Sequence, residues 1–153
     1  MVATLILILS AAMFLFYFQA TCQTILRREF DREYFRSIVS ANGLEFPSLR
    51  KALQDSSQSV DFDRIREGLS CDFLTLTYLL KRDVRADGSY LWDVRLLVLY
   101  FHVVYLLMLA RHVLRLGENS AVMNLTSILQ HLSNLAGLHL AEGLAHRVPA
   151  KVF

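Results

Sequence analysis

The stretch from Val2 to Leu26 carries no charged side chain, and it constrains the fold of this chain more than any other feature. An uncharged helix of about 25 residues is about 37 Å long, enough to cross a hydrocarbon core of about 30 Å with some tilt. A cleaved signal peptide would start with a basic region and end in an Ala-x-Ala-like site, and this stretch has neither. We therefore predict an uncleaved transmembrane anchor over residues 1–26.

The basic residues on the two sides of this stretch are unequal. Arg27, Arg28, Arg32 and Arg36 follow it closely, and no basic residue precedes it. Because basic flanks favour the cytoplasmic side of a membrane, we expect an integral membrane protein with its N-terminus facing out. Residues 27–153 then form a cytoplasmic domain.

The remaining length suits one compact domain. The chain has 16 basic and 14 acidic residues, and their interspersed pattern predicts no nucleic-acid binding. Its two cysteines, Cys22 and Cys71, form neither a CxxC pair nor a disulfide framework. We expect both to be free, buried side chains.

The anchor helix is predicted to continue beyond the membrane to about Ser40. Apolar positions recur there at helical spacing, with arginines and acidic residues between them. These positions are Leu26, Phe30, Phe35, Ile38 and Val39. Ala41-Asn42-Gly43 then supplies residues that tolerate a left-handed backbone, which commonly ends a helix.

A short helix and a long amphipathic helix are predicted next. Pro47 suits the first turn of the short helix, and the polar linker Asp55–Ser59 closes it. Asp61 is a candidate N-cap for the long helix, and Asp72 is expected to be a solvated charge. The apolar face of that helix comprises Phe62, Ile65, Leu69, Phe73, Leu76 and Leu80.

The segment Tyr90–Leu116 predicts a helix whose centre, residues 96–110, is apolar on every face. Such a helix lies either at the centre of a bundle or in lipid. Its uncharged part covers only about 23 Å, less than the hydrocarbon core of about 30 Å. We predict a central core helix, with a second membrane-embedded segment over residues 96–110 as the alternative.

The last helix is predicted from Asn119 or Ser120 to about Ala145, before Pro149. Its polar face carries no charge and comprises Asn124, Ser127, His131 and Asn134. Because a solvated helix normally carries charged residues, we expect another chain or the membrane surface to cover this face. A merely exposed polar face is the alternative.

A ridge of small residues follows the same helix and comprises Ser133, Gly137, Ala141 and Ala145. Such a ridge permits close approach of another helix. The predicted neighbour is the Tyr90–Leu116 helix, packed antiparallel, and a helix of a partner subunit is the alternative.

Histidine is the only side chain that suggests a cofactor. His102, with His139 as a candidate partner, could serve as an axial ligand of a haem or chlorin between helices. The chain has no CxxCH, HExxH, P-loop or GxSxG motif and no catalytic arrangement of carboxylates. We therefore expect His102 to be structural, with its ring bonded to a nearby carbonyl, and we predict no cofactor, metal or catalytic residue.

The sequence thus predicts an all-α protein in which a transmembrane helix continues into a small bundle of about four long helices and one short one. The function that fits is an accessory or scaffolding subunit of a membrane protein complex without catalytic activity. Its partners would be membrane lipid and, through the last helix, other subunits of the complex. The alternative is a small membrane subunit that binds haem or chlorin for electron transfer or pigment binding.

Overall fold

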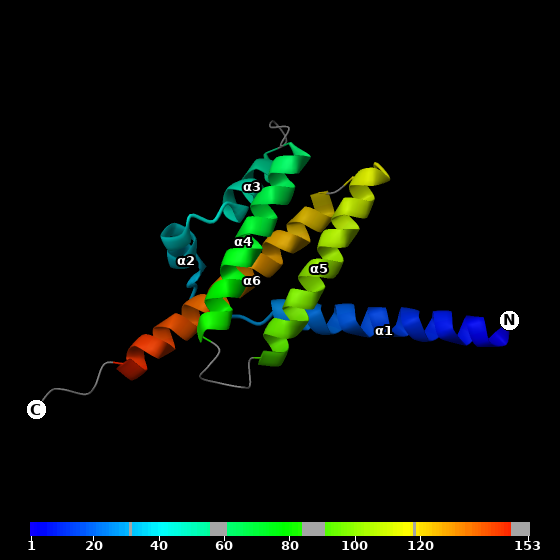
Figure 1. Ribbon diagram of the computed structural model, residues 1–153, viewed down its shortest axis with the longest axis horizontal. Coiled ribbons are helices and arrows are strands. Elements are labelled where there is room, and N and C mark those ends of the chain that lie inside the picture. Colours follow the sequence, from blue (N-terminus) through cyan, green and yellow to red (C-terminus); the bar gives the residue numbers. More distant parts are fainter. Residues whose placement is uncertain (31, 56–60, 84–90, 118, 148–153) are drawn as a thin grey trace, which may run out of the picture.

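The computed structural model describes residues 1–30, 32–55, 61–83, 91–117 and 119–147 (Figure 1). All secondary structure in these ranges is helical, which confirms the all-α prediction. The helices are α1 (Val2–Leu26), α2 (Phe35–Asn42), α3 (Phe46–Gln54), α4 (Phe62–Asp83), α5 (Leu91–Val113) and α6 (Asn119–Arg147). Four of these are long and two are short, so the described ranges hold one short helix more than predicted.

Helix α6 lies at the centre of the bundle. It contacts all five other helices, and most of its residues from Ala121 to Gly137 are buried. The small residues Ser133 and Gly137 within that run let neighbouring elements approach closely. Helix α6, whose sequence mixes apolar and polar residues, therefore forms the core, and the more apolar α5 does not.

Helix α5 is buried on one face only, which corrects the prediction that it is the central helix. Its buried residues are Leu97, Tyr100, Phe101, Val104 and Met108. Large apolar side chains on the opposite face, such as Leu99 and Leu106, remain exposed. Because the sequence of α5 is apolar on every face, it does not determine which face packs. In the fold, one face packs against the bundle and the opposite face is exposed.

Helix α1 has two parts with different surroundings. Residues 2–17 are exposed and extend away from the bundle, whereas Cys22 and Ile25 near its end are buried in the core (Figure 1). The Phe18 ring meets Tyr100 of α5 edge-on, with 6.1 Å between ring centroids. Two helical stretches in the described ranges, Val2–Leu26 and Trp92–Val113, are long and apolar enough to cross a membrane.

The predicted continuation of α1 to Ser40 is wrong. Helix α1 ends at Leu26, and a separate helix begins at Phe35. Phe30, in the stretch between them, packs on α6, with 4.9 Å between the centroids of its ring and the His131 ring. Phe30 packs against α6 and the Phe35 amide bonds to Asn134, so contacts distant in sequence override the local helical pattern. The expected left-handed stop is confirmed at Gly43, where φ is +63°.

Helix α4 matches its predicted apolar face. Five of the six predicted positions are buried, and the sixth, Phe62, stacks on His112 with 3.6 Å between ring centroids. Gly117, with φ at +75°, follows α5 close to the predicted stop. Pro149 and most of the predicted linker Asp55–Ser59 lie outside the described residues.

Two predicted side-chain environments on α4 are wrong. Asp72 is buried instead of solvated, because its Oδ2 accepts hydrogen bonds from the amides of Glu45 (2.9 Å) and Phe46 (2.7 Å). Burial raises the pKa of this carboxyl, and the two amide hydrogen bonds partly oppose that rise. Cys71 is exposed, whereas Cys22 is buried as expected, and both are free.

Candidate functional site

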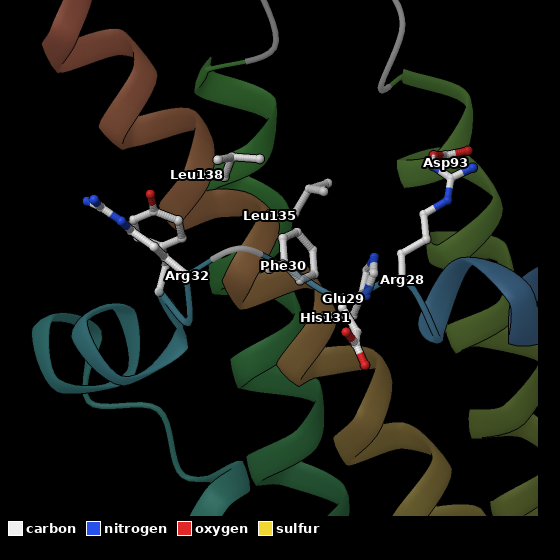
Figure 2. Close-up of a pocket in the computed structure, with 9 residues that line it drawn as sticks. Arg28, Glu29, Phe30, Arg32, Asp93, His131, Leu135 and Leu138 are labelled. Carbon is white, nitrogen blue, oxygen red and sulfur yellow. Dashed lines mark hydrogen bonds and ion pairs between the residues drawn. The ribbon is translucent and has the colours of Figure 1, made fainter.

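A polar hollow lies where the segment after α1 crosses α6. Figure 2 shows this hollow, which has a volume of about 430 Å³, and a second hollow of about 460 Å³ shares four of its lining residues. The shared residues are Arg28, Glu29, Phe30 and His131. The crossing segment therefore forms a wall common to both hollows.

The charges of the hollow are tied to the fold. The Arg28 guanidinium donates to Asp93 Oδ2 at 2.8 Å and so joins the residues after α1 to the first turn of α5 (Figure 2). In the second hollow, Arg50 Nη1 donates to Gln130 Oε1 at 2.8 Å. Surface pairs of this kind contribute at most about 1 kcal/mol each, so their main effect is to fix the path of the chain.

His131 is the buried titratable group of this hollow, and the Phe30 ring covers it. Burial lowers the pKa of the imidazole, and the positive charge of Arg28 lowers it further, while Asp93 acts weakly in the opposite direction. The site thus favours a neutral ring. A neutral histidine covered by an aromatic ring suits a packing role between the segment and α6.

The uncharged polar face of α6 is covered by this chain itself over part of its length. His131 and Asn134 are buried beneath the segment that precedes α2, Ser127 is half-buried and Asn124 is exposed. Asn134 Oδ1 accepts the amide N–H of Phe35 at 2.8 Å. For His131 and Asn134, the cover that we expected from another chain or a membrane comes from within the molecule.

The ridge of small residues is covered at one end and open at the other. Ser133 is buried and donates to the Leu129 carbonyl at 2.8 Å. A Cβ atom at Gly137 would overlap Tyr34, so the close neighbour is the start of α2 and not α5 as predicted. Ala141 is half-buried and Ala145 is exposed.

The histidine candidates do not form a cofactor slot around His102. Its ring is exposed on α5, and Nδ1 donates to the Val98 carbonyl at 2.7 Å, which confirms the expected carbonyl bond. His139 is half-buried on α6. Within the described ranges, no group of three or more His, Cys, Asp or Glu residues could hold a metal ion.

A second candidate surface lies on the outer side of α5. We call it the α5 stripe: it comprises Trp92, Leu99, Val103, Leu106 and Ala110, which are all exposed and fall on one face at helical spacing. The stripe itself carries no charge. Arg95 lies at its edge, with the guanidinium 6.0 Å from the centre of the Trp92 ring. The sequence showed that α5 is apolar, but not which of its faces stays uncovered.

No protein-family model, curated protein or solved structure matches this chain.

Proposed function

We propose that this protein is a membrane-anchored accessory or scaffolding subunit of a membrane protein complex, without catalytic activity of its own. The observation that carries this proposal is the exposed part of α1. Residues 2–17 are almost entirely apolar, and each of them is exposed. Burying a large apolar side chain is worth about 1.5–3 kcal/mol, so a helix like this one favours lipid strongly over water.

The orientation we propose follows from the arginines after α1. Arg27 and Arg28 lie beyond its last residue, and both are exposed. They suit the cytoplasmic surface of a membrane, with the N-terminus outside and the helical domain in the cytoplasm.

The end of α6 supplies a surface for a protein partner. Ala141 and Ala145 continue the small-residue ridge, and the apolar side chains of Leu140 and Leu144 beside them are exposed. This end of α6 lies on the opposite side of the domain from the free end of α1 (Figure 1). The domain can therefore bind a partner protein at the end of α6 while α1 lies in lipid.

The polar hollow adds no competing chemical role. The charge of Arg28 is paired with that of Asp93. His131 packs beneath Phe30, and its burial favours the neutral imidazole. The alternative of haem or chlorin binding has less support, because the His102 ring is exposed and, among the described residues, only its contact with Phe73 of α4 covers it from another helix.

The test is co-purification from native membranes with the substitution Leu144→Arg. Leu144 is 65% exposed, and Leu74 on α4 is 64% exposed, so Leu74→Arg is a matched control. Because both side chains lie on the surface, neither change is expected to move the free energy of unfolding by more than about 0.5 kcal/mol. We expect Leu144→Arg to lose the associated subunits and Leu74→Arg to keep them.

Two results would count against the proposal. If the wild-type chain purifies alone from membranes under mild detergent, it is not a subunit of a complex. If both variants retain the same partners as the wild type, the end of α6 is not the contact surface.

A further inference from the structure

We propose that the α5 stripe lies in the interfacial layer of the membrane, so that the helical domain rests directly on the bilayer instead of hanging from α1. This inference rests on the proposed anchoring by α1. It assigns α5 to the membrane surface, in place of either a central core helix or a second crossing.

The first support is the length of α1 that is free to enter lipid. The exposed part, residues 2–17, extends over roughly 24 Å at about 1.5 Å per residue. A hydrocarbon core is about 30 Å thick, and any tilt of the helix shortens its reach. The free part can span only if the domain around residues 18–26 lies against the membrane, or partly within its surface layer.

The second support is the position of α5. Figure 1 shows α5 running crosswise to α1, on the side of the domain that faces the free end of α1. The two helices meet through Phe18 and Gln23 of α1, which both contact Tyr100. With α1 across the bilayer, α5 therefore runs along its surface. The α5 stripe is opposite the buried face, so it points away from the domain and toward the lipid.

The third support is the chemistry of the stripe. An interfacial helix buries its apolar face by about 5–10 Å at the boundary between headgroups and acyl chains, which is enough to make up the missing length of α1. Tryptophan is enriched at this boundary, and arginine can place its charge among the headgroups while its stem lies on apolar surface. Trp92 and Arg95, in contact at one end of the stripe, fit these two roles.

The packing of α4 against α5 argues against a second membrane crossing by α5. The Phe101 ring of α5 stacks on Phe73 of α4, with 3.9 Å between ring centroids. Helix α4 carries exposed charges, among them Arg64 and Glu67. If α5 crossed the membrane in this fold, those charges would enter the hydrocarbon, where each is costly.

The chain contains a single tryptophan, and it lies on the stripe, so its fluorescence reports on the proposal directly. The full chain is reconstituted into vesicles of zwitterionic and anionic lipids, brominated either near the headgroup or near the bilayer centre. The wild type reports from Trp92. The double variant Trp92→Phe with Val103→Trp reports from the middle of the stripe, and Trp92→Phe with Tyr78→Trp reports from exposed α4 as the control.

We expect the chain to float with the vesicles and both stripe tryptophans to lose most of their fluorescence to the shallow bromines. The control tryptophan keeps its fluorescence. Stronger quenching by the deep bromines in the Val103→Trp variant would show a second crossing and overturn the proposal. A chain that floats with unquenched stripe tryptophans would also overturn it while leaving the anchor intact. Failure to float would contradict the anchor itself, and with it this inference.

Discussion

At the scale of one residue, Gly137 is a position where the sequence shows a small residue and the structure shows the reason, which is a close contact with another element. Its backbone lies against the side chain of Tyr34, the N-cap residue of α2, and Ile38 within α2 lies beside it. The spacing of small residues correctly indicated a close approach. It could not indicate the neighbour, because α2 and α6 are distant in the sequence and many helices fit such a ridge.

We expect Gly137→Ala to destabilise the protein by about 1–3 kcal/mol, because the new methyl group overlaps Tyr34 and the backbone must shift. The control is Gly143→Ala on the same helix, where no atom lies within 4 Å of the added Cβ. Alanine stabilises a helix interior by up to about 1 kcal/mol relative to glycine, so the control is expected to be neutral or stabilising. Chemical unfolding of the purified protein in detergent measures both. Equal effects of the two substitutions would contradict the close contact.

At the scale of elements, the two short helices α2 and α3 are stabilised in the same way. The N-terminus of each is capped by a side chain from a long helix. The N-cap residues Tyr34 of α2 and Glu45 of α3 make no side-chain cap hydrogen bond. Asn134 of α6 accepts the Phe35 amide instead, and Asp72 of α4 accepts the first amides of α3. Short helices are marginal alone, so these bonds tie their formation to the bundle.

We expect Asn134→Ala to destabilise the protein by about 0.5–2 kcal/mol, the usual cost of losing an N-cap acceptor. Asn124→Ala on the same helix is the control, because Asn124 is exposed and alanine is at least as good a helix former. Thermal unfolding gives the stability difference. If the two alanine variants unfold alike, the bond from Phe35 to Asn134 does not hold α2.

At the scale of the whole molecule, the orientation in the membrane can be read from a native cysteine. Cys71 is exposed on α4 and Cys22 is buried, so a maleimide reagent is expected to label Cys71. If the domain is cytoplasmic, a membrane-impermeant maleimide leaves the chain unlabelled in intact cells and labels it after lysis. Cys71→Ser is the control and is expected to abolish the labelling. Labelling before lysis would reverse the proposed orientation.

The sequence by itself determined the properties that depend on neighbouring residues. Helical periodicity fixed the all-α class and the face of α4, and the run of uncharged residues marked α1 as a candidate span. Gly43 indicated where a helix stops, because a left-handed backbone is a local property. These signals lie within a few positions of one another, so they can be interpreted without the fold.

The tertiary structure alone decided everything that depends on residues distant in sequence. It ended α1 at Leu26, because the path across α6 packs Phe30 against His131 and pairs Arg28 with Asp93, a residue 65 positions away. It also buried Asp72 beneath α3 and placed α6 instead of α5 at the centre. An apolar helix fits equally well in a core, in lipid or at their boundary, because the hydrophobic effect has no direction. Only the packing of its neighbours shows which face of α5 remains free.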